Sequence, residues 1–150
     1  MTQPNILYFS TKEAIKIHDD LVIAISGGLS GTIDKGRLES VFSHIKNDDY
    51  YPTFEEKLTR LIFATAMFHM FRDGNKRSSL AFGTYFLKIN GYDYLTDYFL
   101  QEMENIVLWL AMHLIDEQLL REIITSIVIF DEITEDIKLK IALSVEQNFN

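Results

Sequence analysis

The chain has 150 residues, of which 47% are hydrophobic, and this favours a single folded domain over residues 1–150 and excludes a disordered chain. It has no cysteine and no apolar run long enough to cross a bilayer, which excludes disulfides and Cys-based metal sites, indicates no membrane partner and fits a cytoplasmic location. Its net charge of −8 argues against direct nucleic-acid binding, which depends on neutralising phosphates, and suits a basic protein partner.

The first helix is predicted to begin at a capping box, after a short apolar lead. Ser10 is its N-cap, and Glu13 reaches back to the Ser10 backbone. Apolar residues then recur at helical spacing as far as Ile25. His18 and Asp19 form the dipeptide of metal-dependent HD phosphohydrolases, but that site needs further His and Asp ligands in a set order. We therefore expect His18 to face the edge of the core.

A glycine-rich segment follows this helix, because residues 26–36 contain four of the seven glycines. Such a loop can cradle phosphate, but this one lacks the Lys-Ser/Thr ending of a P-loop and follows no evident strand. A phosphate cradle is therefore disfavoured, and a plain mobile loop is a simpler interpretation of the composition.

Two helices are predicted between the glycine-rich segment and the polar stretch that begins at His69. Residues 38–45 carry an apolar stripe with the spacing i, i+3, i+4 and i+7, and Asp34 is placed to cap it. A second capping box, from Thr53 to Glu56, starts a helix that is apolar nearly all round over residues 61–68. We expect this second helix to be central and buried.

The polar stretch from His69 to Arg77 separates two apolar segments. Its Asp73-Gly74-Asn75 has the composition of a tight turn, since Gly and Asn tolerate positive φ, so the region is predicted to be helix, loop, helix. Asn75, Lys76 and Arg77 then open the second helix. A helix N-terminus with free N–H groups and two cations is an anion site, and the nearby His and Asp indicate a base and a metal ligand.

The rest of the chain is predicted to be helical. The helix after the motif ends at Asn90-Gly91, and further apolar periodicity covers residues 103–114 and 134–145. Residues 119–130 are another helix candidate, although the β-branched end at 127–130 is also compatible with a strand. The fold class is therefore mainly α, with six or seven helices and at most a small hairpin.

The motif His-x-Phe-x-Asp-Gly-Asn-Lys-Arg at residues 69–77 resembles the signature of the Fic/Doc (Fido) superfamily. Lys76, where many Fic proteins have a second glycine, resembles the Doc (death-on-curing) toxin branch. The resemblance implies a Fic fold with a core at about residues 6–118 and extra C-terminal helices at 119–150. It also implies that a flap hairpin lies over the active site and aligns the target protein by strand addition, and this flap comprises Gly28, Leu29, Ser30, Gly31 and Thr32.

The resemblance and the chemistry of the side chains assign the same roles within the motif. His69 is the base that accepts the proton of an attacking hydroxyl, and Asp73 is the ligand of Mg²⁺. The phosphates of ATP, the implied co-substrate, are held by Gly74, Asn75, Lys76 and Arg77. Phe71 is expected to be an apolar anchor that orients the loop.

The sequence leaves open which group is transferred. Lys76 in place of Gly, and Leu80 in place of a later Arg, differ from the nucleotidyl-transferring Fic proteins and imply a Doc-like protein kinase that transfers the γ-phosphate. Gly74, where the prototypical Doc has Ala, matches the nucleotidyl transferases and keeps protein AMPylation as an alternative. A non-catalytic binding module with a Fic fold is a third interpretation, which the intact motif disfavours.

The Doc resemblance also implies partners. They are a protein substrate of the elongation factor Tu class, whose modification arrests translation, and a Phd-like antitoxin whose tail folds into a groove on the toxin. The chain lacks the Ser/Thr-x-x-x-Glu-Gly/Asn motif by which some Fic proteins inhibit themselves. Residues 119–150 exceed the short form of the family, and the hypothesis that follows is that they cover the groove.

Overall fold

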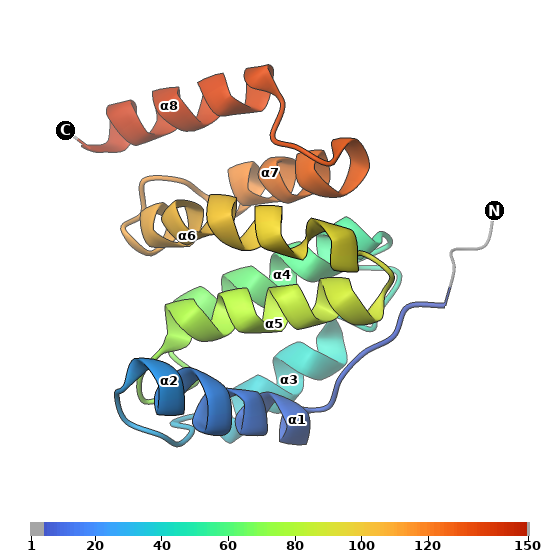
Figure 1. The fold of residues 1–150 in the computed structure, drawn as a ribbon, viewed down its shortest axis with the longest axis vertical. Coiled ribbons are helices and arrows are strands. Elements are labelled where there is room, and N and C mark those ends of the chain that lie inside the picture. Colours follow the sequence, from blue (N-terminus) through green and yellow to red (C-terminus); the bar gives the residue numbers. More distant parts are fainter. Residues whose placement is uncertain (1–4, 150) are drawn as a thin grey trace.

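The computed structural model describes residues 5–149, which form a stack of helices (Figure 1). The first helix is continuous but changes type, because a π-helix, η1 (Ile17–Ile23), joins α1 (Thr11–Lys16) to α2 (Ala24–Ser26). The remaining elements are α3 (Lys35–His44), α4 (Phe54–Met67), α5 (Asn75–Ile89), the 3₁₀ turn η2 (Asp93–Leu95), α6 (Thr96–Ala111), α7 (Glu117–Phe130) and α8 (Glu135–Phe149). The predicted mainly α fold is confirmed. In the described part of the chain, no helix is both long and apolar enough to cross a bilayer.

The helices begin where their capping residues predict. The Ser10 hydroxyl accepts the N–H of Glu13, whose carboxylate accepts the N–H of Ser10 in return. Asp34 caps α3 in the same way, by accepting the N–H of Arg37 at 2.9 Å. Thr53 caps α4 by accepting the N–H of Glu56 at 3.1 Å. Local chemistry therefore sets three of the helix starts.

The centre of the molecule is the pair α4 and α5, which pack closely along their length (Figure 1). Leu58, Leu61 and Ile62 of α4 are fully buried, which confirms the prediction of a central helix. Helices α6–α8 lie on one side of this pair, and α1–α3 lie on the other (Figure 1). The motif loop, which connects α4 to α5, is therefore held between two helices that cannot shift without disrupting the core.

Helix α7 runs to Phe130, so the strand considered for residues 127–130 does not form. Ile123, Ile124 and Ile127 have no exposed surface, because their helical spacing turns them toward the core together. The burial of this face outweighs the β preference of the branched side chains. Helix α8 then packs on α7 at the end of the molecule opposite α1 and α2 (Figure 1).

Candidate active site

The motif loop turns the chain sharply between α4 and α5. His69 lies two residues beyond the end of α4 and has φ of 51°, and Gly74 caps α5 with φ of 73°. A Cβ atom on Gly74 would lie 3.1 Å from Cδ1 of Ile23, so both the conformation and the space favour glycine. The predicted sequence of helix, loop and helix is confirmed.

Phe71 and Asn75 hold the loop in place. Phe71 is fully buried, as predicted for an anchor, and its ring meets that of Phe82 edge-on with centroids 5.9 Å apart. The Asn75 side chain donates to the Phe71 carbonyl at 3.0 Å and accepts the Phe71 N–H at 3.1 Å. In this structure, the Asn75 amide group therefore braces the loop, and the backbone N–H is what Asn75 offers to an anion.

The start of α5 has the properties of an anion site. The first helical hydrogen bond runs from the Ser78 N–H to the Gly74 carbonyl at 2.9 Å, so the N–H groups of Asn75, Lys76 and Arg77 precede the helical ladder. The side chains of Lys76 and Arg77 are exposed beside them. The structure thus brings the predicted phosphate-binding residues to one helix end, where the helix dipole also favours negative charge.

Asp73 is exposed next to this helix end. One carboxylate oxygen accepts the Gly74 N–H at 2.9 Å, and the other lies 3.4 Å from the Leu29 N–H. Among residues 5–149, no three His, Cys, Asp or Glu side chains gather in a way that could hold a metal ion. A cation at Asp73 would therefore depend on one carboxylate together with phosphate oxygens and water, which is how Mg²⁺ is commonly held.

The prediction that the flap forms a hairpin is wrong. Within the described residues the flap segment 28–32 forms no strand, and only an isolated antiparallel bridge joins Thr32 to Phe71. The reason is the positive φ of Gly27, Gly28 and Gly31, which interrupts an extended chain.

The flap is nevertheless attached to the motif loop along one edge. The Arg72 N–H donates to the Gly31 carbonyl at 3.1 Å, and the Ile33 N–H donates to the Met70 carbonyl at 2.9 Å. A Cβ atom on Gly28 would lie only 2.6 Å from Oδ2 of Asp73, so the backbone of the flap lies directly against that carboxylate. Leu29 and Ser30, in the middle of the segment, are exposed.

His69 is exposed at the other end of the loop. The ring of the preceding residue, Phe68, contacts two guanidinium groups, with Arg37 at 5.5 Å and Arg60 at 5.1 Å from its centroid. Arg37 also donates to the Phe68 carbonyl at 3.3 Å. These contacts fix the backbone at His69 and leave its imidazole open to a substrate hydroxyl.

The sequence did not predict the contact between His18 and the motif loop. Instead of facing the edge of the core, the His18 side chain is fully buried, and its Nε2 lies 2.6 Å from the Asp73 carbonyl oxygen. Its Nδ1 lies 2.7 Å from Oδ1 of Asp19, which also accepts the Gly31 N–H at 3.0 Å. Burial alone would raise the pKa of Asp19, but the bonds from Gly31 and His18 hold that pKa below its ordinary value. The available signal was the position of His18 four residues after the buried Ala14.

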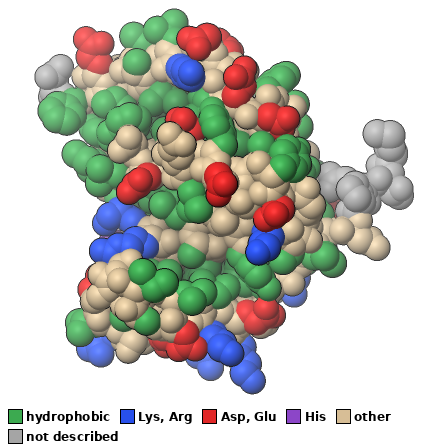
Figure 2. All heavy atoms as spheres, viewed as in Figure 1, with side chains coloured by type: hydrophobic (Ala, Val, Ile, Leu, Met, Phe, Trp, Pro, Cys, Tyr) green, Lys and Arg blue, Asp and Glu red, His purple; other side chains and the backbone are tan. Residues whose placement is uncertain are grey.

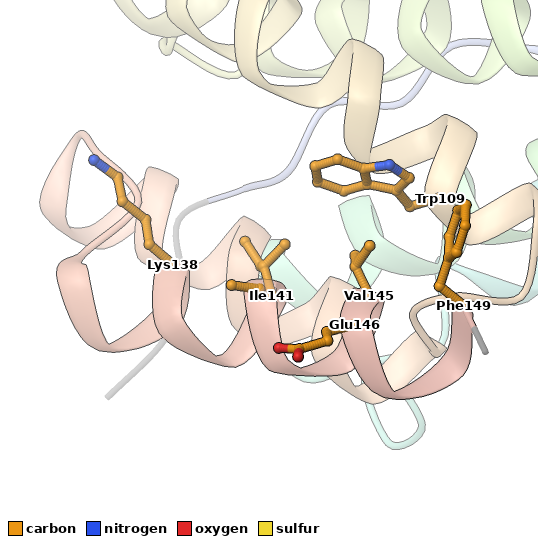
Figure 3. Close-up of a pocket in the computed structure, with 7 residues that line it drawn as sticks. Trp109, Lys138, Ile141, Val145, Glu146 and Phe149 are labelled. Carbon is orange, nitrogen blue, oxygen red and sulfur yellow. The ribbon is translucent and has the colours of Figure 1, made fainter.

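A largely apolar groove of about 990 Å³ lies beside the anion site, between the first helix and α5. Leu21 and Ile25 line it from the first helix, Leu80 lines it from α5, and Arg77 reaches it from the anion site. Residues 119–150 do not line this groove, because α7 and α8 lie at the opposite end of the molecule (Figure 1). Their expected covering of an antitoxin groove stays a prediction. Figure 3 shows instead that α8 directs Ile141 and Val145 toward Trp109 of α6.

Known proteins resemble this chain in the region of the site. The model of the Fic/DOC family matches residues 8–87, which are more than half of the chain and include both the flap and the motif loop. The chain is also similar to Protein kinase doc of Escherichia phage P1, with 36% identity over 88 residues that cover 56% of this chain and 68% of the phage protein. The family match ends within α5, so α6–α8 lie outside it.

Proposed function

The chain belongs to the Fic/DOC family, as its motif predicts, and from that premise we propose that it is a Doc-like toxin and protein kinase that transfers the γ-phosphate of ATP to a hydroxyl of a target protein. The observation that carries the proposal is Lys76 in the first turn of α5, where it supplies a cation within the anion site. The similarity to a phage protein named as a kinase supports the same reaction.

The reaction needs a base, an anion site and an in-line attack. In the proposed mechanism, the target hydroxyl oxygen attacks the γ-phosphorus, and its proton passes to the imidazole of His69. The bond from the γ-phosphorus to the bridging oxygen breaks, and ADP leaves with that oxygen. The N–H groups at the start of α5, with Lys76 and Arg77, hold the phosphates while charge moves toward ADP. Asp73 would hold Mg²⁺, which would neutralise phosphate charge there.

The flap would bring the target hydroxyl to the γ-phosphate. One edge of the flap is occupied by the motif loop, whereas Leu29 and Ser30 are exposed. A segment of the target that lies along the exposed backbone in an extended form would be aligned by main-chain hydrogen bonds. We propose a protein of the elongation factor Tu class as the target, with arrest of translation as the outcome.

Nucleotidyl transfer is a second candidate function, favoured by Gly74. This glycine has φ of 73° and leaves no room for a Cβ atom without a shift of Ile23. The nucleotidyl-transferring Fic proteins share a glycine at this position, so the α-phosphorus remains an alternative site of attack.

A paired labelling assay distinguishes the two reactions. The protein is incubated with Mg²⁺ and either purified elongation factor Tu or a cell lysate, once with γ-labelled ATP and once with α-labelled ATP. We expect label from γ only, no label after chelation of the metal, and no label with His69→Ala. Label from α would overturn the kinase proposal in favour of nucleotidyl transfer. Label on lysate proteins but not on elongation factor Tu would overturn the target alone.

The apolar groove next to Arg77 supports a regulatory partner. An antitoxin of the Phd type would seat an apolar segment on Leu21, Ile25 and Leu80, next to the anion site. Co-expression tests this proposal. Growth arrest by the wild type that a Phd-like protein relieves, and that His69→Ala does not cause, is the expected result. Equal growth with the wild type and His69→Ala would favour the non-catalytic binding module.

A further inference from the structure

A buried histidine contacts the motif loop from the first helix. The His18 ring stacks on Phe71, with centroids 4.0 Å apart and planes 11° from parallel. Its Nε2 contacts the Asp73 carbonyl and its Nδ1 contacts the Asp19 carboxylate, at 2.6 and 2.7 Å. Both partner atoms are oxygens that can accept a hydrogen bond from the ring. The ring is therefore oriented from three sides.

Asp19 extends this contact to the flap. The oxygen that faces His18 also accepts the Gly31 N–H at 3.0 Å, and the Gly31 carbonyl accepts the Arg72 N–H at 3.1 Å. Gly31 is therefore joined to the motif loop twice, once directly through Arg72 and once through Asp19, His18 and the Asp73 carbonyl. The flap and the motif loop are therefore connected by two separate sets of hydrogen bonds.

We propose that His18 and Asp19 are positioning residues that set the distance between the flap and the phosphate-binding loop during transfer. The part of this inference that concerns the transfer rate rests on the proposed function. The flap aligns the target hydroxyl, and the loop holds the phosphate, so the reacting atoms meet only if these two segments keep one spacing. A displacement of 1 Å is enough to cost about 10²-fold in rate. Neither side chain touches the reacting groups in this mechanism, so they act through the backbone of Gly31 and Asp73.

Substitutions at position 18 separate packing from positioning. His18→Phe keeps an aromatic ring against Phe71 and removes both hydrogen bonds. His18→Asn retains a donor near the position of Nδ1, and so retains the bond to Asp19. His18→Gln retains a donor near the position of Nε2, and so retains the bond to the Asp73 carbonyl. Asp20→Ala is the matched control, because Asp20 lies in the same π-helix and is exposed.

Hydrogen exchange of the flap tests the coupling without any activity. We expect His18→Phe to raise exchange at the Gly31 amide about tenfold, the factor typical of one lost hydrogen bond, with α4 unchanged. His18→Asn should keep most of the protection, and Asp20→Ala should keep all of it. Unchanged exchange at Gly31 in a folded His18→Phe protein would overturn the proposal. If that variant does not fold, Asp19→Ala replaces it with the same expectation at Gly31, because the Asp19 side chain is partly exposed and is not part of the core.

The rate of label transfer tests the consequence for the reaction. We expect Asp19→Ala and His18→Phe to lower the maximal rate per folded molecule about tenfold or more, with the apparent KM for ATP within about twofold of the wild type. His18→Gln should recover part of the rate, because it holds the Asp73 carbonyl. Wild-type rates in both Asp19→Ala and His18→Phe would overturn the positioning role. If the wild type transfers no label, the proposed function fails, and the exchange experiment still decides whether the two segments are coupled.

Discussion

The end of the molecule that carries the motif and the end formed by α6–α8 are built in different ways. Residues 1–90 contain 11 Lys and Arg against 10 Asp and Glu, whereas residues 91–150 contain 3 against 12. The face in Figure 2 reflects this, since most of its Lys and Arg side chains lie in the lower half and acidic side chains spread over the upper half. The net charge of the chain therefore does not describe the surface around the site.

The two ends also differ in what holds them together. At the site, main-chain hydrogen bonds join the flap to the loop, and His69, Lys76 and Arg77 are exposed. At the other end, α7 packs on α4 through fully buried aliphatic side chains such as Leu120 and Ile123. The difference indicates that exposed side chains of the site supply reactivity, whereas buried side chains supply stability. Substitutions at the site should change the transfer rate, and substitutions in α7 should change the free energy of unfolding.

Among substitutions at the site, His69→Ala should have the largest effect on the rate of label transfer. Loss of the proposed general base should lower the rate of label transfer by about 10²–10⁴-fold. The midpoint of thermal unfolding should stay within a degree or two of the wild type, because the side chain is exposed. A large drop in the unfolding midpoint would show that the site also supports the fold.

Ile123→Ala is the matching substitution at the far end. Removing a fully buried side chain from α7 should lower the free energy of unfolding by about 2–5 kcal/mol, measured by denaturant titration. The transfer rate per folded molecule should not change. Leu139→Ala on α8 is the control, since that side chain is 60% exposed and should shift stability by less than about 0.5 kcal/mol. A lower rate in folded Ile123→Ala would contradict the separation of the two ends.

Gly28→Ala tests whether the flap belongs to the site rather than to the core. Its φ of 111° and the 2.6 Å approach of a Cβ atom to Asp73 should displace the flap and lower the transfer rate about tenfold. The free energy of unfolding should fall by only about 1–3 kcal/mol, from backbone strain. Gly27→Ala is the control, because a Cβ atom there meets nothing within 4 Å while the positive φ is similar. Equal rates in the two variants would mean that contact with Asp73 has no role.

Glu117→Gln gives the smallest expected effect. It tests whether the ion pair between α4 and α7 couples the two ends of the molecule. Glu117 of α7 pairs with Arg60 of α4 at 3.0 Å, and both side chains are partly exposed. Such pairs contribute about 0–1 kcal/mol, so stability should fall only slightly and less so at high salt. Arg60 also stacks on Phe68, next to His69, and that contact remains. A change in transfer rate would therefore reveal that the two ends are coupled through Arg60.

The sequence predicted the elements that depend on neighbouring residues. The caps Ser10, Asp34 and Thr53 lie where the chain predicts them, and α5 begins at Asn75 as predicted, because each choice is made within one turn. The motif loop could be predicted for the same reason.

Features that depend on distant residues could not be predicted in this way. His18 meets a carbonyl 55 positions away, and nothing near it in the sequence specifies that partner. The flap was expected to be a hairpin, but its glycines adopt positive φ, and its bonds go to Met70 and Arg72 instead of to a second strand. The end of α7 has β-branched residues, and the choice of helix came from burial against the rest of the fold.

The π-helix η1 bears on how the length of this chain can change in evolution. One residue inserted into an α-helix turns everything beyond it by about 100°, which would carry the flap glycines away from Asp73. A wider π turn absorbs the extra residue and leaves the segments on both sides in register. Because His18 and Asp19 lie inside η1, we expect an insertion or deletion at this point to preserve their contacts only if the helix changes between π and α type there. Relatives one residue shorter here should have an α-helix and the same active site.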